Sequence, residues 1–200
     1  GGGRLFLNQG KGKFAEAPGT REIFRWLGLG KEDTPAGVAI ADINGDGLPD
    51  IIVGHHTKAP WKTPITIRVY LNRGVKDGVP VFEDITEKCG LFPLTMKAPH
   101  LEIQDFDNDG LPDIYLSAGW LDKDGEITPL IFRNQGVKDG LPRFVAPKPI
   151  AAPMVYYPAG PSADYDNDGR IDLFLVNWFQ GNQCRLLHND SPVRNWLDVQ

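Results

Sequence analysis

The sequence predicts an all-β protein made of β-propeller blades of four antiparallel strands, about three to three and a half blades in all. Gly (23) and Pro (17) make up one residue in five without a collagen period, which favours many turns and short strands. The apolar runs are short and rich in β-branched and aromatic residues. A set of motifs also returns about every 60 residues. A repeating unit of four short strands is the pattern of a propeller blade.

The clearest repeat is an Asp-rich stretch of nine residues. Its copies begin at Asp42, Asp105 and Asp164, so their starts lie 63 and then 59 residues apart. The stretch Gly-Val-Lys-Asp-Gly occurs twice, at residues 74–78 and 136–140. A third feature is an Asn that follows an apolar run, at Asn8, Asn72, Asn134 and Asn189. Because the three features share one period, we interpret them as an internal structural repeat.

Each repeat is predicted to hold four strands, and the first complete one shows them best. Residues 38–41 lead into the Asp-rich loop, and residues 51–53 leave it. Residues 65–71 form a third strand that ends at Asn72. A Lys-Asp-Gly hairpin turn then leads to a fourth strand at residues 81–85. The strands that leave the later loops are residues 114–116 and 173–175.

The repeats divide the chain into four parts. Residues 1–33 hold the last strands of one blade, 34–92 and 93–152 are whole blades, and 153–200 make up most of another. Both ends fall in strand-like sequence, so we expect a fragment of a longer chain. An open arc of blades exposes apolar faces. We therefore expect the remaining blades of the parent chain, or another copy, to complete the ring.

The Asp-rich loops have the composition of a calcium site. Ca²⁺ prefers six to eight oxygen ligands, and alternate residues of a tight loop can converge on one ion. The sixth position is always Gly, where the backbone must turn sharply. Positions 1, 3, 5 and 9 offer side-chain oxygens and position 7 a carbonyl, whereas no thiol or imidazole lies in the loops to favour softer metals. The predicted ligands of three Ca²⁺ ions are Asp42, Asn44, Asp46, Leu48 and Asp50; Asp105, Asp107, Asp109, Leu111 and Asp113; and Asp164, Asp166, Asp168, Arg170 and Asp172.

Two other interpretations of the loops fit the sequence less well. Asp, Asn and Gly favour ordinary polar turns, but three copies in register argue against that. An EF-hand begins in the same way but needs Glu at position 12 and flanking helices. Position 12 holds Val53, Leu116 and Leu175, in sequence that favours strands. The sequence therefore predicts calcium in a strand-loop-strand turn, with the weakest binding in the first loop because Asn44 replaces a carboxylate.

The charge balance supports a cation in these loops. They hold 11 of the 26 acidic residues, and carboxylates crowded together repel one another. Three Ca²⁺ would move the formal charge from -5 to about +1. An acidic chain is a poor match for nucleic acid. No apolar run approaches the ~18 residues that span a bilayer, so we expect a chain that does not cross a membrane.

The loop pattern Asp-x-[Asp/Asn]-x-Asp-Gly-x-x-Asp, followed by an apolar strand, resembles the FG-GAP/VCBS repeat that builds propellers such as that of integrin α-subunits. Residues 82–91 (FEDITEKCGL) are similar to the segment that closes the blades of ASPIC/UnbV, or cartilage acidic protein-like, proteins. Residues 188–190 (HND) and 195–197 (NWL) are similar to the start of the C-terminal module of those proteins. The resemblance implies a secreted or cell-surface protein with a seven-bladed propeller and one calcium ion in each loop.

Two classes of function follow from this pattern. The first is a non-catalytic extracellular module in which calcium stiffens the blades and the propeller presents loops to a protein or glycan partner. The alternative is part of a calcium-dependent polysaccharide-active enzyme resembling a lyase, or a glycan-binding lectin. Tyr156, Tyr157 and Arg170 are the hints of an enzyme, and no nucleophile-base motif accompanies them. The tryptophans that follow the loops have two alternative roles, which are stacking on a sugar ring and packing at the rim of a blade or between blades. These residues are Trp61, Trp120 and Trp178.

Two cysteines, Cys89 and Cys184, lie 95 positions apart. They could pair with each other, pair with sequence outside this chain, or stay free. No Cys/His cluster points to zinc.

Overall fold

The computed structural model of the chain is all-β apart from one short helix, which confirms the predicted fold class. It describes residues 2–25, 34–60, 62–121, 127–145, 160–177, 180–181 and 183–192, without the side chains of 118–121 and 127–129. Within this described part, the strands form four separate antiparallel sheets and no closed barrel. No helix there is long and apolar enough to cross a membrane.

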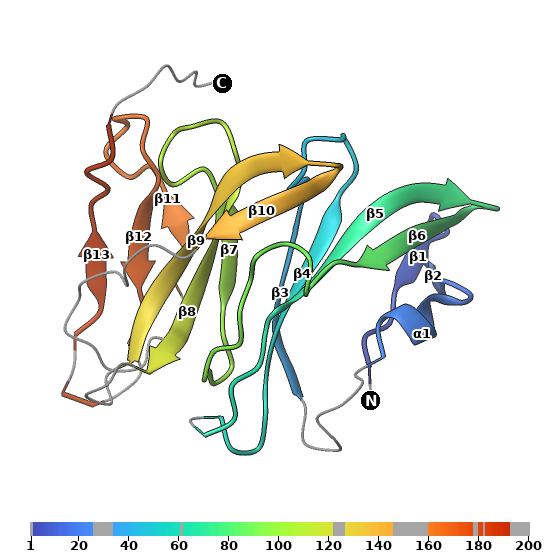
Figure 1. Cartoon of the computed structure of the whole chain (residues 1–200), viewed down its shortest axis with the longest axis horizontal. Coiled ribbons are helices and arrows are strands. Elements are labelled where there is room, and N and C mark those ends of the chain that lie inside the picture. Colours follow the sequence, from blue (N-terminus) through green and yellow to red (C-terminus); the bar gives the residue numbers. More distant parts are fainter. Residues whose placement is uncertain are drawn as a thin grey trace.

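Each sheet is a meander in which every strand pairs with the next one along the chain (Figure 1). The first sheet holds two strands and is followed by the helix: β1 (Phe6–Asn8), β2 (Phe14–Glu16) and α1 (Thr20–Ile23). The second holds β3 (Thr34–Ala41), β4 (Asp50–His56), β5 (Arg68–Lys76) and β6 (Val79–Asp84). The third holds β7 (Leu101–Gln104), β8 (Asp113–Leu121), β9 (Ile127–Lys138) and β10 (Leu141–Val145). The fourth holds β11 (Ser162–Ala163), β12 (Asp172–Leu175) and β13 (Arg185–Leu187).

The boundaries of the third predicted strand were wrong. β5 starts at Arg68 rather than Ile65, and it continues through Asn72 to Lys76. Ile65 instead exchanges two backbone hydrogen bonds with Leu94, at 2.9 and 2.8 Å, in an isolated bridge. The short helix α1 was not predicted from the sequence. The Lys-Asp-Gly turn is present between β5 and β6, with positive φ at Asp77 and Gly78.

The hydrophobic core lies between the sheets rather than inside any one of them. Successive residues of a strand face opposite sides of its sheet. Ile52 of β4 and Ile114 of β8 belong to one buried cluster, at the seam between the second and third sheets. Tyr115, the neighbour of Ile114, faces the other side and packs with Leu173 and Leu175 of β12. Ile114, Tyr115 and Leu116 of β8 are all buried, so this strand is apolar on both faces there rather than alternating.

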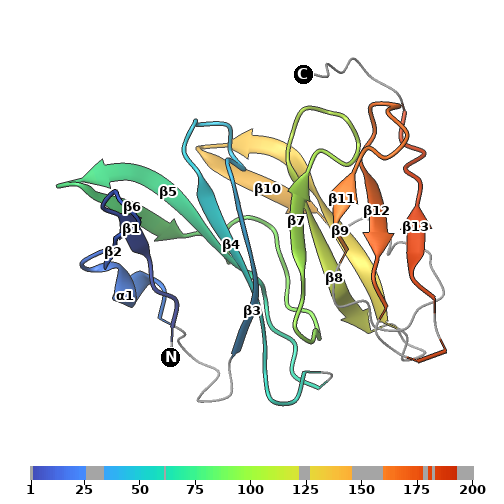
Figure 2. The ribbon, with the colours of Figure 1, turned by 180° about the vertical axis from the view of Figure 1, so that it is seen from behind.

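The sheets stand side by side in chain order (Figures 1 and 2). The sheet of β1 and β2 lies at one end of the row and the sheet of β11 to β13 at the other. The three Asp-rich loops connect β3 to β4, β7 to β8, and β11 to β12. They all lie along the upper edge of the molecule in both views. The repeat therefore brings its most acidic segments to one edge.

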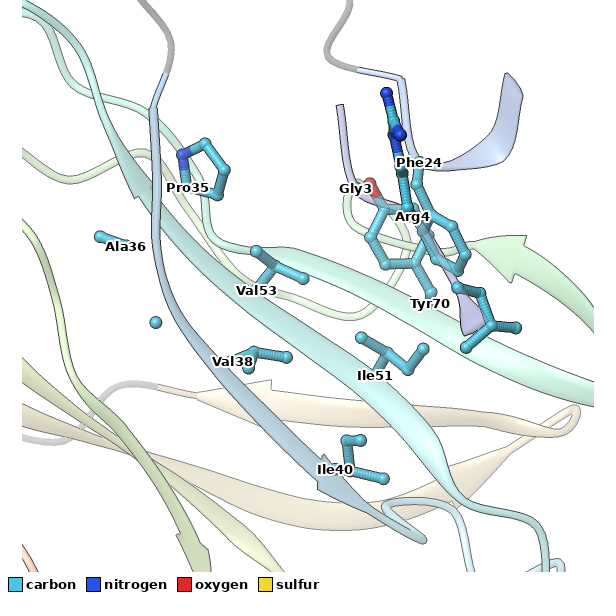
Figure 3. A pocket seen from close by; sticks show the side chains of 12 residues that line it. Gly3, Arg4, Phe24, Pro35, Ala36, Val38, Ile40, Ile51, Val53 and Tyr70 are labelled. Carbon is cyan, nitrogen blue, oxygen red and sulfur yellow. The ribbon is translucent and has the colours of Figure 1, made fainter. Parts of the chain in front are cut away.

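An apolar groove of about 390 Å³ opens on the face of the second sheet that is turned toward Phe24 and residues 3–5 (Figure 3). Val38 and Ile40 of β3 line it and are 64% and 66% exposed. Phe24 closes one side and packs edge-on against Tyr70, with ring centroids 5.0 Å apart. Leu101, which matches Val38 one repeat later, is only 4% exposed because the second sheet covers it. The groove is therefore a blade face with only partial cover from the described residues.

The two cysteines are not bonded to each other. Cys89 is buried in the cluster between the second and third sheets, and burial raises the pKa of its thiol. Its backbone carbonyl accepts a hydrogen bond from the N–H of Phe144 in β10, at 2.7 Å. Cys184 is exposed, and its sulfur contacts the backbone of Asn177.

Alanine at Gly90 should destabilise the seam between the second and third sheets. Gly90 has a φ of 88°, and a Cβ there would lie 2.4 Å from the backbone oxygen of Phe144. We expect the free energy of unfolding in a urea titration to fall by about 3 kcal/mol, from backbone strain and overpacking together. Gly74→Ala is the control, because Gly74 has a φ of 90° and no atom within 4 Å of the added Cβ. Equal losses in the two variants would contradict the close approach at this seam.

Candidate metal centre

The Asp-rich loops share one backbone conformation. Position 6 has positive φ in all three, as predicted: 84° at Gly47, 88° at Gly110 and 83° at Gly169. Position 4 also has positive φ, at Gly45, Asn108 and Asn167. This second requirement was not predicted. Its signal was present in the sequence, because Gly and Asn are the residues that best tolerate a left-handed backbone.

The first Asp of each loop holds the turn together. Asp42 accepts hydrogen bonds from the N–H groups of Asp46 at 3.1 Å and Gly47 at 2.8 Å. Asp105 and Asp164 accept the matching pairs in the later loops, at 2.7 to 3.1 Å. Charged acceptors make stronger hydrogen bonds than neutral ones. The carboxylate at position 1 therefore shapes the backbone as well as supplying negative charge.

The ninth-position Asp is the most buried acidic residue of each loop. Asp50, Asp113 and Asp172 are 0%, 0% and 2% exposed. In each, one oxygen accepts the N–H of position 2 in the same loop. The other oxygen accepts the N–H of the Asn that ends the apolar run of the third strand, at 2.8, 2.8 and 2.7 Å. This carboxylate thus fastens its loop to the third strand of its own sheet.

Burial dominates the electrostatics of this position. Burial raises the pKa of Asp113 to about 6, although the N–H groups of Asn134 and Phe106 act in the opposite direction. Burial raises the pKa of Asp50 in the same way. Each carboxylate oxygen has a second lone pair, so a cation could share it with the N–H donor. A nearby divalent ion would also favour the charged form of these buried groups.

The Asn of the third strand is a structural residue that the sequence analysis used only as a repeat marker. The amide of Asn134 donates to the carbonyls of Pro112, at 3.2 Å, and of Ile43 in the preceding loop, at 3.1 Å. Asn189 does the same to Ile171 and to Phe106 in the preceding loop, at 2.9 and 2.8 Å. Its recurrence in the sequence was the available signal. This Asn connects each of these loops to the one before it.

The structure brings several of the predicted ligands together. Carboxylate oxygens of Asp105, Asp107 and Asp113 lie within 4.8 Å of one another, as do those of Asp164, Asp166 and Asp172. In the first loop, Asn44 instead donates its amide to Asp46 at 3.0 Å. The fifth-position carboxylates turn inward to their own loops and accept the N–H of position 7, at 2.9 Å in each case. The carbonyls of Leu48, Leu111 and Arg170 stay predicted ligands.

The donor set fits a hard cation. The grouped atoms of the second loop are carboxylate oxygens, which Ca²⁺ and Mg²⁺ prefer. Asp107, one of the three, has a buried Oδ1 without a hydrogen-bond partner, so one of its oxygens is an unused acceptor. Such a group is costly unless something positive lies beside it. A cation among these three carboxylates would satisfy it.

The third loop differs because an imidazole reaches it. His188, to which the sequence analysis assigned no role, places Nε2 3.2 Å from Asp166 and 3.3 Å from Asp168. Its Nδ1 lies 2.9 Å from Asp190, and that contact raises the pKa of His188. The third loop itself contains no imidazole, as the sequence shows, but His188 reaches it from outside the loop. His188 directly follows β13, which brings it to the loop from 16 or more positions away in the chain.

Two arginines also enter the loops. Arg133 of β9 forms an ion pair with Asp107, and Arg170 forms one with Asp168 in its own loop. Although burial acts in the opposite direction, the N–H and guanidinium of Arg170 lower the pKa of Asp168. Arg170 was suggested as a residue of an enzymatic cleft, but its guanidinium turns inward to its own loop. The other residues suggested for sugars, Tyr156, Tyr157, Trp61 and Trp178, lie outside the described residues, as does the side chain of Trp120.

Comparison with known protein families agrees with this geometry. A model described as FG-GAP-like repeat matches residues 1–53 and 105–175, which include all three Asp-rich loops. The chain belongs to the FG-GAP-like repeat family. In this member of the family, each loop joins the first two described strands of its sheet.

Curated relatives of this FG-GAP-like chain share a name. The chain is 29% identical to cartilage acidic protein 1 of Homo sapiens and 28% identical to that of Mus musculus. It is 27% identical to that of Xenopus tropicalis. Each alignment covers 98% of this chain but only 28% of the relative, so the chain spans little more than a quarter of their length.

Alanine at Asn134 tests the connection between neighbouring loops. The substitution leaves the carbonyls of Ile43 and Pro112 and the N–H of Gly136 without their partner. We expect the free energy of unfolding to fall by about 2 kcal/mol in a denaturant titration. Asn72→Ala is the matched control, because Asn72 makes the same bonds within its own sheet, to Pro49 and Gly74. The described residues show no bond from Asn72 to a preceding loop, so its substitution should lower the free energy of unfolding by about 1 kcal/mol less. An equal or larger loss in Asn72→Ala would contradict the role of Asn134 in connecting two loops.

Proposed function

We propose that this chain is a calcium-binding extracellular β-propeller module in which three Ca²⁺ ions stiffen the blade turns. The observation that carries the proposal is the grouping of loop carboxylates around a shared centre, with an unpartnered buried oxygen on Asp107. The family match supports the repeat, and the oxygen-only ligand set of the second loop supports a hard cation. The ligands in each loop are those that the sequence predicted at positions 1, 3, 5, 7 and 9.

The role of the ions in this proposal is structural. The carboxylates at positions 1 and 9 also accept backbone N–H groups, so an ion bound to them would tie several backbone segments together at once. Without an ion, carboxylates held within 4.8 Å of one another repel. Anything that binds only the folded chain stabilises it by mass action. Calcium would therefore stabilise each blade at its acidic turn, where the carboxylates repel one another.

The repeat also defines the proposed domain organisation. We assign residues 1–33 to the last strands of one blade, 34–92 and 93–152 to whole blades, and 153–200 to most of another. A further blade, from the same polypeptide or from a second copy, is proposed to cover Val38 and Ile40, because Leu101, the counterpart of Val38 one repeat later, is covered in this way. Light scattering after size-exclusion chromatography tests whether a second copy supplies this blade. A second copy predicts a dimer, and a soluble monomer excludes it.

An extracellular location and a protein or glycan partner complete the proposal. The name of the human, mouse and frog relatives refers to cartilage and to an acidic protein, and this chain has a formal charge of -5. The ring of seven blades implied by the family resemblance would present the loops between strands to such a partner. Adhesion or another interaction, rather than catalysis, is the role that we propose.

Calcium binding should be measurable directly. We expect isothermal titration calorimetry to show three Ca²⁺ per chain. At a calcium concentration 100-fold above Kd, each filled site should raise the melting temperature by about 5 to 10 °C relative to EDTA. Asp46→Asn, Asp109→Asn and Asp168→Asn should each remove one ion. The amide that replaces each carboxylate still accepts the N–H of position 7, so the turn itself is kept.

Asp139→Asn is the control for these variants, because Asp139 is an exposed residue of the β9–β10 hairpin turn, outside the loops. It should keep all three ions and the melting temperature of the parent chain. A parent chain that gives no calcium heat and the same melting curve in calcium and in EDTA would refute the proposed function.

A further inference from the structure

The second and third loops each contain a positive charge supplied by the chain itself. The guanidinium of Arg133 contacts Oδ2 of Asp107, the third position of the second loop. The guanidinium of Arg170 contacts Oδ2 of Asp168, the fifth position of the third loop. Among the described residues, no basic side chain forms an ion pair with Asp42, Asp46 or Asp50 of the first loop.

The repeat explains where these arginines come from. Arg133 is the residue before the structural Asn134, and its counterparts in the first and third repeats are Leu71 and His188. Arg170 is the seventh loop residue, where the other two loops have Leu48 and Leu111. Each arginine therefore occupies a position that is apolar in at least one sister repeat, and its charge is not needed to build the blade.

The charges also match the loops in which they lie. The first loop has three Asp residues, because Asn44 takes the third position, and the later loops have four each. Arginine stays protonated at any physiological pH. When one arginine is counted with each later loop, all three loops have a formal charge of -3. The extra carboxylate of each later loop is thus balanced by one guanidinium.

We propose that Arg133 and Arg170 are built-in counter-cations that hold the second and third loops in shape without calcium and that compete with calcium for Asp107 and Asp168. This inference rests on the proposed calcium sites. A guanidinium and Ca²⁺ seek the same carboxylate oxygens, so a loop that binds one must loosen its contact with the other. The cost of displacing the arginine lowers the calcium affinity of that loop.

The arginine contacts leave atoms unsatisfied, which makes them replaceable. Asp107 Oδ1 and Arg170 Nε are both buried without a hydrogen-bond partner. The side chain of Arg133 is 35% exposed, so it can leave the carboxylate for solvent. Arg170 has a second acceptor within reach, the carbonyl of Ser191 at 3.4 Å. Calcium would satisfy the buried oxygen that the guanidinium does not.

The proposal changes the expected order of the three sites. Asn44 gives the first loop one carboxylate fewer, but that loop has no competing cation among its described neighbours. The later loops gain a carboxylate and a competitor together. Their affinities should therefore lie close to that of the first loop rather than far above it.

The third loop allows a site-specific test with terbium, which takes the same oxygen ligands as calcium and is sensitised by a nearby aromatic ring. Tyr165 is the second residue of this loop, and its ring lies 6.1 Å from that of His188. Arg170→Leu gives the loop the seventh residue of its two sister loops. We expect Tb³⁺ luminescence to saturate at about tenfold lower concentration, with Ca²⁺ displacing the ion. Tyr165→Phe in both backgrounds identifies the part of the signal that comes from this loop.

The second loop is tested by Arg133→Leu, which copies Leu71 of the first repeat. Calorimetry should show one of the three Ca²⁺ sites tightened about tenfold. The same variant should melt at a lower temperature than the parent chain in EDTA, because the second loop has lost its counter-cation. Arg73→Leu is the matched control, since Arg73 is paired at 2.7 Å with Glu83 on the neighbouring strand, outside the loops. It should leave both calcium affinity and the number of ions unchanged.

The outcomes separate this inference from the proposed function. A parent chain that binds three Ca²⁺, with unchanged or weaker affinity in Arg133→Leu and Arg170→Leu, keeps the function and overturns the competition. A parent chain that binds neither Ca²⁺ nor Tb³⁺ overturns the function and the competition with it. In that case the melting temperatures in EDTA still decide whether the arginines act as counter-cations, because a loss no larger than that of Arg73→Leu overturns this part too.

Discussion

The buried carboxylate at the ninth loop position is the interaction on which the rest of each repeat depends. One oxygen of Asp113 accepts an N–H from the start of its own loop, and the other accepts the N–H of Asn134 on the third strand. A fully buried charge is tolerated only when such donors surround it. The loop conformation, the second strand that begins at the Asp and the third strand are therefore fixed together. The same two bonds recur at Asp50 and Asp172, which is why the three loops are nearly identical.

The Asn partner extends this arrangement from one repeat to the next. Asn134 and Asn189 each use their backbone N–H for the Asp of their own sheet and their amide for the carbonyl at position 2 of the preceding loop. That same position 2 donates its N–H to the buried Asp of its own loop. Polar groups thus link the blades at the loop edge, while apolar side chains fill the seams below. A network that is satisfied across both repeats fixes the register in which the sheets pack.

Concentrating carboxylates along one edge creates an electrostatic problem that the chain solves in two ways. Backbone N–H groups and two arginines neutralise part of the charge within the protein. The carboxylates of the second loop also include a buried oxygen of Asp107 without a partner, which is an environment that suits a divalent cation. Stability and the spacing of the repeat are therefore two consequences of the same acidic turn, and the proposed ion binding would be a third.

The sequence alone determined the repeat, the all-β class and the position of each acidic loop between two strands, because these depend on local turn chemistry and on a period that can be counted. Ile51, Ile52 and Val53 predicted a strand, but only the packing showed that Ile52 belongs to the seam with the next sheet and that Ile51 and Val53 line the groove on the other face. The start of β5 was misplaced because Ile65 pairs with Leu94, a distant residue that local propensity does not include. The roles of Asn134, Arg133 and His188 were likewise decided by the tertiary structure. Each acts on a loop that lies 16 or more residues away in the chain, so no local pattern in the sequence could assign its partner.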